Sequence, residues 1–196
     1  MLMRRSIAIS CALGLLLLSG AAVSREPVAS AFPPPEARQF DFWLGEWEVT
    51  SSDGRRQGTS RVESVARGYG VLEHWRGDRA EGRSAGASLN AWNPDRKRWQ
   101  QFRIGGDGCV LELGGGLDAN GRMVLEGEQT DGAGRLLNRI SWTPHADGTV
   151  RQVWEQSFDD GQTWRPVFDG RYARLEPMGG GGGGSGRARA MDYMFL

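Results

Sequence analysis

The eight tryptophans of this chain all lie between residues 43 and 164, in short segments whose residues alternate between apolar and polar. Glycine- and aspartate-rich turns separate these segments, and the period of two continues from Gly45 almost to residue 175. Such alternation is typical of strands that bury one face, and large aromatic residues are enriched in strands. The pattern therefore predicts an antiparallel sheet that carries stacked indole rings. The tryptophans are Trp43, Trp47, Trp75, Trp92, Trp99, Trp142, Trp154 and Trp164.

Ten strands are predicted from this alternation, over residues 46–52, 58–65, 70–77, 85–92, 97–105, 108–114, 121–129, 136–143, 148–157 and 163–175. The connecting segments contain Asp-Gly, Asn-Gly and Gly-Gly pairs, which favour hairpin turns, so consecutive strands should be neighbours. A flat sheet would leave two open edges, which closure into an up-and-down barrel removes. We therefore predict an all-β fold: one barrel with room inside for a ligand. A two-sheet sandwich with a crossover in the connector 77–84 is the alternative.

The segment before the first strand predicts one short amphipathic helix. It is preceded by Pro35, has an acidic residue in its first turn and ends at Gly45. Phe40, Trp43 and Leu44 have the spacing i, i+3, i+4 and share one face, which we expect to cover one end of the sheet.

The N-terminal segment has the features of a secretory signal peptide. Arg4 and Arg5 precede an apolar run over residues 7–18, and small residues end at Ser24. Cleavage after Ser24 would place the mature protein in the periplasm or outside the cell, without a membrane contact. An uncleaved membrane anchor is the alternative.

The remaining chain divides into three parts. Three consecutive prolines favour an extended linker, and a run of glycines favours a disordered tail. The predicted organisation is a signal peptide over residues 1–24, a proline-rich linker over 25–35, a β-barrel domain over 36–176 and a glycine-rich tail over 177–196. A docking motif at Tyr193–Leu196 is the alternative for the end of the tail.

Composition limits the partners and the stabilising chemistry. The net charge of zero becomes minus two once Arg4 and Arg5 leave with the signal peptide, so we expect no nucleic-acid partner. Cleavage also removes Cys11 and leaves Cys109 as the only thiol, which rules out an intrachain disulfide. The chain has only two histidines and no C-x-x-C or H-E-x-x-H motif, so we predict no metal and no cofactor.

Three short motifs resemble functional patterns. Gly82–Gly86 matches the G-x-S-x-G nucleophile elbow, but that elbow needs a helix after the serine, and the residues that follow alternate like a strand. Ser157–Trp164 resembles the Asp-box hairpin of sialidase propellers; it occurs once, so we interpret it as a turn. Asp118–Gly121 begins like a calcium loop and continues without enough oxygen ligands.

Polar residues beside tryptophans within strands are the best candidates for a binding site. Residues two apart in a strand face the same side, as in the pair Glu73 and Trp75 or the triplet Trp99, Gln101 and Arg103. If that side is the interior, Glu73 and Arg139 must pair or line a wet pocket, because a lone buried charge is costly. If it is the exterior, they form an ordinary solvated face. The predicted ligand-binding residues are Glu73, Trp75, Asn90, Trp92, Gln101, Arg139, Gln152 and Trp154.

Five blocks of the chain resemble the segments of the domain-of-unknown-function 1579 family (DUF1579). They are Phe40–Val49, Gly70–Trp75, Ser88–Trp92, Arg139–Pro144 and Val150–Ser157, in the family's order. Gly45 and Trp47 also resemble the Gly-x-Trp start of calycins, the lipocalin and fatty-acid-binding barrels, in which a short helix precedes the first strand. Both resemblances support the barrel, and neither implies catalytic residues.

These features together predict an exported, non-catalytic, calycin-like barrel that binds a small, partly apolar molecule, either aromatic or lipid-like, in its interior. One alternative is an enzyme that uses Glu73, with His74 or Glu155, as acid and base. Glu73 and His74 are adjacent in a strand and face opposite sides, so they cannot act together directly. The other alternative is a solidly packed barrel that serves as a structural or protein-binding module.

Overall fold

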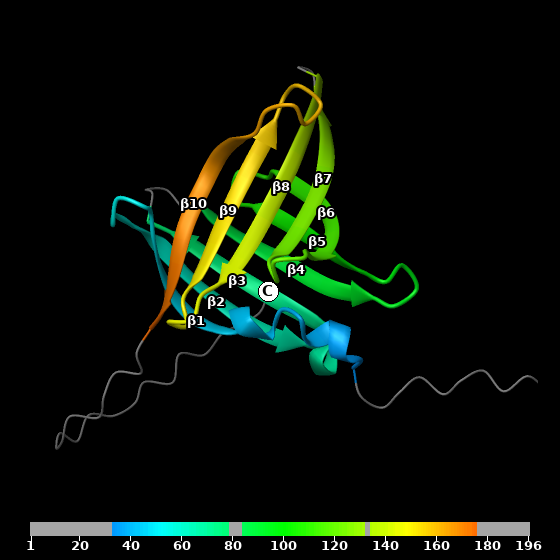
Figure 1. Cartoon of the computed structure of the whole chain (residues 1–196). Coiled ribbons are helices and arrows are strands. Elements are labelled where there is room, and N and C mark those ends of the chain that lie inside the picture. Colours follow the sequence, from blue (N-terminus) through cyan, green and yellow to red (C-terminus); the bar gives the residue numbers. More distant parts are fainter. Residues whose placement is uncertain (1–32, 79–83, 132–133, 176–196) are drawn as a thin grey trace, which may run out of the picture. The chain divides into compact units, whose positions relative to one another are not determined.

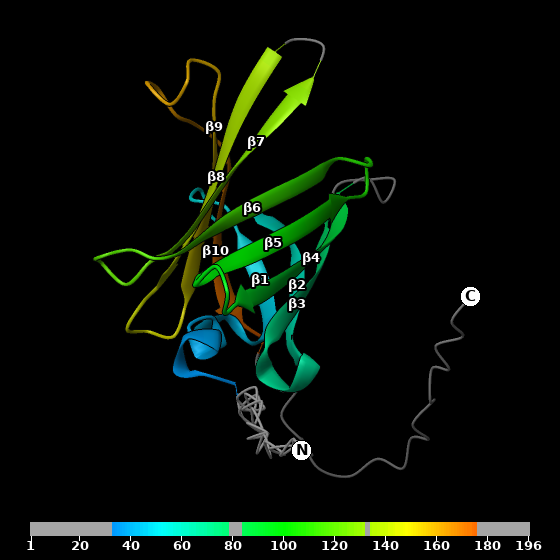
Figure 2. The ribbon, with the colours of Figure 1, turned by 90° about the vertical axis from the view of Figure 1, so that its right-hand side faces the viewer.

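Ten antiparallel strands form one closed barrel in the computed structural model, which describes residues 33–78, 84–131 and 134–175 (Figures 1 and 2). Each strand pairs with the next along the chain, and the last pairs with the first. The strands are β1 (Gly45–Thr50), β2 (Arg56–Val65), β3 (Gly70–Gly77), β4 (Ala85–Asn93), β5 (Arg98–Gly105), β6 (Val110–Leu117), β7 (Met123–Asp131), β8 (Gly134–Pro144), β9 (Val150–Ser157) and β10 (Arg165–Arg174). The predicted fold class and all ten predicted strands are confirmed.

Direct pairing of β3 with β4 overturns the sandwich alternative, which required a crossover between them. The predicted signal peptide (1–24), most of the linker (25–35) and the tail (177–196) lie outside the described residues. Within the described part, no helix is long and apolar enough to cross a membrane.

An aspartate at the start of a turn and a glycine near its end explain the tight turns between strands. In the β6–β7 turn, Asp118 Oδ1 accepts hydrogen bonds from the backbone N–H groups of Asn120 and Arg122, both at 2.9 Å. Gly121 takes a φ of 75°, a left-handed value that favours glycine. The same aspartate receives the Arg122 Nε–H at 2.7 Å, so its oxygens are occupied by the turn itself. This supports the interpretation of Asp118–Gly121 as a hairpin turn and not as a calcium-binding loop.

The barrel closes where β1 meets β10. Trp47 lies opposite Arg174 in this ladder, and the Arg174 guanidinium carbon lies 4.4 Å from the centroid of the Trp47 ring. Arg174 Nη1 also donates to the Leu44 carbonyl at 3.0 Å, and the Leu175 N–H donates to the Glu46 carbonyl at 2.9 Å. Closure is therefore reinforced by side chains as well as by the backbone ladder.

The predicted N-terminal helix is present as two consecutive 3-10 turns, η1 (Pro35–Arg38) and η2 (Asp41–Trp43), at one end of the barrel (Figure 1). Phe40 is fully buried, and its ring makes edge contacts with Trp99 and Trp142 at centroid distances of 5.0 Å and 5.2 Å. Trp99 Nε1 donates to Gln39 Oε1 at 3.0 Å, which ties this segment to β5. The segment therefore closes this end of the barrel with an aromatic plug, together with a further 3-10 turn, η3 (Ala66–Gly68).

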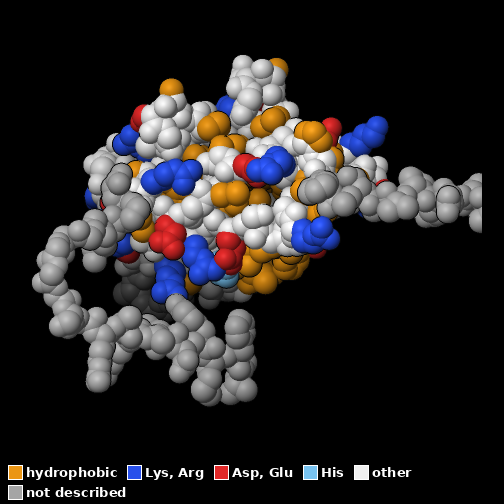
Figure 3. Space-filling model, turned by 90° about the horizontal axis from the view of Figure 1, so that it is seen from below, with side chains coloured by type: hydrophobic (Ala, Val, Ile, Leu, Met, Phe, Trp, Pro, Cys, Tyr) orange, Lys and Arg blue, Asp and Glu red, His pale blue; other side chains and the backbone are white. Residues whose placement is uncertain are grey.

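The outer surface carries interspersed charges of both signs. On the face shown in Figure 3, basic and acidic side chains lie near one another with apolar side chains between them. Arg56, for example, pairs with Glu48 at 3.0 Å and with Asp78 at 2.6 Å across β1–β3.

Candidate functional site

The inner face of the barrel changes character along its axis. Next to the plug it is filled by apolar side chains, including Trp47, Trp99 and Trp142. A middle layer of polar side chains follows, and these are also buried. Its members are Ser60, Glu73, Ser88, Asn90, Gln101, Asn138 and Gln152. Beyond this layer the end opposite the plug encloses a cavity.

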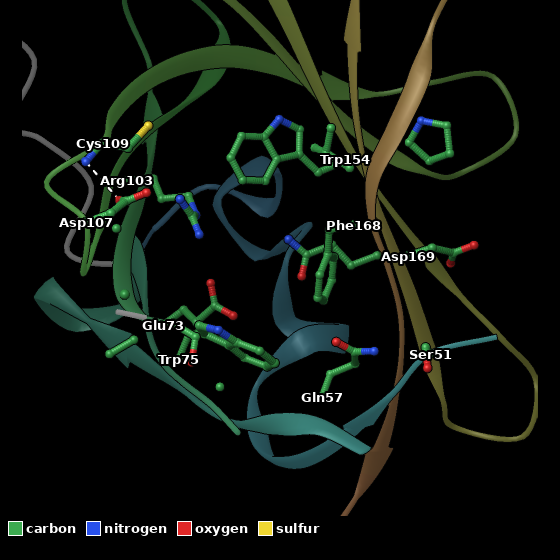
Figure 4. A pocket seen from close by; sticks show the side chains of 18 of the residues that line it. Ser51, Gln57, Glu73, Trp75, Arg103, Asp107, Cys109, Trp154, Phe168 and Asp169 are labelled. Atoms are coloured by element: carbon green, nitrogen blue, oxygen red, sulfur yellow. Dashed lines mark hydrogen bonds between the residues drawn. The ribbon is translucent and has the colours of Figure 1, made fainter. Parts of the chain in front are cut away.

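This cavity, here called the cup, has a volume of about 620 Å³ (Figure 4). Four aromatic residues line it: Trp75 from β3, Trp154 from β9, and Phe168 and Tyr172 from β10. The rings of Trp75 and Phe168 meet edge to face, with centroids 5.8 Å apart. The β1–β2 and β5–β6 turns, together with Ser84 just before β4, supply further lining residues and mark the open end. A pocket of this size with aromatic walls suits a small organic molecule.

Two glycines, Gly86 and Gly105, line the cup beside Trp75. Strand pairing places Trp75 opposite Gly86, and Gly86 opposite Gly105, in one row on the inner face. A Cβ atom at Gly105 would lie 2.4 Å from Asp107 Oδ1, and one at Gly86 would lie 2.9 Å from the Ile104 carbonyl oxygen. A larger residue at either position would therefore collide with its neighbours, and this part of the cup wall is bare backbone.

Glu73 forms the polar floor of the cup. Its side chain is buried, and its carboxylate oxygens accept hydrogen bonds from Ser60 Oγ at 2.9 Å and Ser88 Oγ at 3.0 Å. The Tyr172 hydroxyl lies 3.5 Å from Glu73 Oε1 and donates to Gln152 Oε1. The two strands that flank β3 therefore each supply one serine hydroxyl that holds the carboxyl group in place.

Burial dominates the electrostatics of this floor. Desolvation raises the pKa of Glu73 above its ordinary value, although the hydroxyls of Ser60 and Ser88 and the charge of Arg103 act in the opposite direction. Burial also raises the pKa of Tyr172 well above its ordinary value, and the nearby Glu73 adds to that effect. Both groups therefore keep their proton to a higher pH than they would in water.

Arg103 is the cation of the cup. It extends from β5, and its guanidinium carbon lies 4.9 Å from the centroid of the Trp154 ring. Among the described residues, no carboxylate lies within ion-pair distance of it. Its charge acts on Glu73 at longer range, as the effect on the Glu73 pKa shows.

A network of amides lies beneath and beside the cup. Gln101 Nε2 donates to Asn90 Oδ1 at 2.8 Å, and Asn90 Nδ2 donates to the Val71 carbonyl at 3.3 Å. On the other side, Asn138 Oδ1 accepts hydrogen bonds from Trp154 Nε1 at 2.9 Å and Gln156 Nε2 at 3.1 Å. The second network fixes the orientation of the Trp154 indole in the cup wall.

Of the eight residues predicted from the sequence, four line the cup: Glu73, Trp75, Gln152 and Trp154. Asn90 and Gln101 face the interior and are buried, but they do not line the cavity. Trp92 packs against Trp99 at a centroid distance of 6.3 Å, among the apolar side chains near the plug.

Arg139 requires a correction, because it lies on the outer face of the barrel. Its guanidinium pairs with Glu155 at 3.0 Å and covers the Trp164 ring at 4.0 Å from the centroid. The alternation of β8 buries Asn138 and Ile140 inside, so Arg139 between them must face outward. It neither pairs with Glu73 nor contributes to the cup.

Arg103, Gln57 and Phe168 are among the cup residues that sequence reasoning did not select as ligand contacts. Arg103 could have been found, since it lies two residues beyond Gln101 on the same face. Gln57 and Phe168 lie beside register shifts, between Val49 and Thr50 and between Pro166 and Phe168. Such irregularities change which residues face inward, so simple alternation does not predict them.

The two other motifs are explained by local structure. β4 begins at Ala85 and continues to Asn93, so no helix follows Ser84 and the nucleophile-elbow geometry is absent there; Gly82 and Arg83 lie outside the described residues. In the Asp-box turn, Asp159 accepts hydrogen bonds from the Thr163 N–H at 2.8 Å and from its hydroxyl at 2.6 Å. The motif is a hairpin turn, as expected.

The groups proposed for acid–base catalysis are not brought together. His74 lies on the outer face, 3.2 Å from Glu63, and Glu155 pairs with Arg139 on the same outer surface. The described residues contain no group of three or more His, Cys, Asp or Glu side chains arranged to hold a metal ion.

Two comparisons with known proteins, one against family models and one against curated proteins, gave no match. What the structure itself establishes is a closed, ten-stranded antiparallel barrel, an architecture consistent with a calycin-like barrel.

Proposed function

We propose that this chain is an exported, non-catalytic β barrel that binds a small, partly apolar molecule in the cup. The observation that carries the proposal is a cavity of about 620 Å³ walled by Trp75, Trp154 and Phe168, with polar groups at its floor. Export and a periplasmic or secreted location rest on the sequence of residues 1–24. Membership of DUF1579 rests on the five sequence blocks that resemble that family.

The wall favours a ligand with a planar or aromatic part. Rings that meet edge to face, as Trp75 and Phe168 do, offer both a face and an edge for further ring contacts. The hydrogen bond from Trp154 to Asn138 holds the third ring in a fixed orientation. A rigid wall loses little conformational entropy on binding, which supports affinity for a rigid partner.

The test is a ligand screen by tryptophan fluorescence with a variant that fills the cup. Lipids, haem and aromatic compounds are titrated into the protein, and Trp75 and Trp154 should report binding. Gln57→Trp places a large side chain in the cup from β2 (Figure 4), whereas Thr59→Trp places it on the outer face of the same strand. We expect binding that Gln57→Trp abolishes and Thr59→Trp preserves. A broad panel without any binding would contradict the proposal.

Glu73 supports a second candidate, an enzyme that uses this carboxyl group as a general acid. A buried carboxyl group with a raised pKa at the floor of an accessible cavity is typical of acid–base catalysts. Its near partners are the hydroxyls of Ser60, Ser88 and Tyr172, which position it without supplying a complementary base. Turnover of a bound ligand that Glu73→Gln stops, with binding retained, would favour this candidate over the binding protein.

A further inference from the structure

Arg103 places a positive charge inside the cup, and no carboxylate among the described residues forms an ion pair with it. Its guanidinium stacks on Trp154, and a Cβ atom added at Gly86 or Gly105 would lie 3.8 Å or 3.7 Å from its nitrogens. The two glycines contribute no side chain beside the guanidinium, and the side chain nearest to the Cβ position of Gly105 is that of Asp107. An arginine held by stacking keeps its N–H groups for hydrogen bonds elsewhere.

The acidic groups around the cup are already engaged. Both oxygens of Glu73 accept hydrogen bonds from serine hydroxyls. Asp107 Oδ1, at the β5–β6 turn, accepts the Cys109 N–H at 3.0 Å. The Asp169 side chain points away from the cup (Figure 4) and pairs with Arg151 at 2.7 Å. None of these carboxylates forms an ion pair with Arg103 among the described residues.

We infer that the cup selects ligands that carry one anionic group on an aromatic or planar apolar body, and that Arg103 binds the anion. This inference rests on the proposed binding function and names the ligand class for the same site. The geometry places the anion beside Trp154 and above Glu73, while the apolar body contacts Trp75 and Phe168. A single cation above a carboxyl group accommodates one negative charge and disfavours a second.

The physical reason is that an anionic ligand supplies Arg103 with the ion-pair partner that no described residue provides. A guanidinium beside aromatic walls is partly desolvated, and a carboxylate, sulfonate or phosphate can accept two of its N–H groups at once. Such charge-assisted hydrogen bonds are stronger than neutral ones and strengthen further as water is excluded. A neutral ligand of the same shape gains only the ring contacts.

Two fluorescent probes with the same ring system test the inference. One is 8-anilinonaphthalene-1-sulfonate, which is ionised across the usual pH range, and the other is N-phenyl-1-naphthylamine, which lacks the sulfonate. We expect the full chain to bind the sulfonate about 10- to 100-fold more tightly, the range that a charge-assisted hydrogen bond supplies. The preference should shrink with added salt, whereas binding of the neutral probe should not weaken.

Variants at Arg103 locate the effect. Arg103→Gln should remove the preference for the sulfonate and leave the neutral probe's affinity unchanged within about threefold. Arg103→Lys should retain part of the preference, because the charge remains while the forked geometry is lost. Arg98→Gln is the matched control, since it removes the same charge from the exposed start of β5. If Arg103→Gln fails to fold, the sulfonate preference of Arg103→Lys and the salt dependence of that preference in the wild-type protein test the inference instead.

Three outcomes would overturn the inference. Equal affinities for the two probes in the wild-type protein would show that the cup has no preference for an anion, although binding of the neutral probe would leave the proposed function standing. Sulfonate binding that survives Gln57→Trp would lie outside the cup. Failure of both probes to bind would count against the inference and the proposed function together.

Discussion

Replacing Glu73 by glutamine should raise the free energy of unfolding, by an amount that grows with pH. In the unfolded chain this carboxyl group titrates near its ordinary pKa of 4.5, whereas burial raises its pKa in the barrel. Between these two values the folded protein holds a proton that the unfolded chain has released. The wild-type protein therefore loses stability as pH rises through this window, and the loss levels off above the folded-state pKa.

The size of the effect follows from the linkage between protonation and folding. Within the window, the advantage of Glu73→Gln should grow by up to about 1.4 kcal/mol per pH unit. Below the window both side chains are neutral, and the difference should stay within about 1 kcal/mol. That residual reflects the changed bonding to Ser60 and Ser88, because the amide accepts from one hydroxyl and donates to the other.

Urea unfolding followed by tryptophan fluorescence, at a series of pH values from about 4 to 9, measures the prediction. Glu63→Gln is the control with the opposite sign. Hydrogen bonds from Arg61 and then His74 lower the pKa of Glu63, so its contribution to stability is present above the ordinary pKa and disappears as pH falls through the folded-state value. A difference between Glu73→Gln and wild type that stays flat from pH 5 to pH 8 would refute the assignment of Glu73 as a desolvated carboxyl group.

Three further predictions concern the plug, the Asp-box turn and the outer face. Phe40→Ala should lower the free energy of unfolding by about 3–5 kcal/mol in urea, because it empties the centre of the plug; a loss below about 1 kcal/mol would contradict that role. Asp159→Asn should destabilise the protein at neutral pH, and the difference should disappear as pH falls from 3.8 toward about 2, since hydrogen bonds from Thr163 and Ser157 lower the pKa of Asp159 to about 2. Thermal melts at several pH values test this. Arg139→Gln should leave the affinity for both naphthalene probes unchanged in fluorescence titrations, and a loss comparable to that of Arg103→Gln would contradict its outward placement.

The strands could be predicted because each residue of a strand contributes to the same alternating signal. The strand observed over Gly70–Gly77, for example, has the predicted bounds, and turns rich in aspartate and glycine mark where neighbouring strands end. The barrel follows from these local signals, since hairpins join neighbours and closure removes the edges. The predicted helix is found at the expected position, but as short 3-10 turns, the form that helical segments of only a few residues commonly take.

The sequence did not predict which face of each strand points into the barrel. Alternation shows which residues share a face, but it does not show whether that face is the inner or the outer one. Glu73 with Trp75 and Arg139 with Ser141 satisfy the same spacing, yet the first pair faces inward and the second outward. For β8 the deciding signal was the neighbouring series, in which Ile140 and Trp142 are buried. Register shifts near Gln57 and Phe168 then bring residues into the cup wall that regular alternation does not place there.

The ladder between β1 and β10 has a consequence for how this protein folds. Every other strand pair joins neighbours along the chain, whereas Trp47 and Arg174 come together across almost the whole barrel sequence. The entropic cost of long-range loop closure is thus concentrated in one seam. Because the Trp47 indole lies in that seam between Arg174 and Tyr172, its emission in stopped-flow refolding should report ring closure separately from hairpin formation.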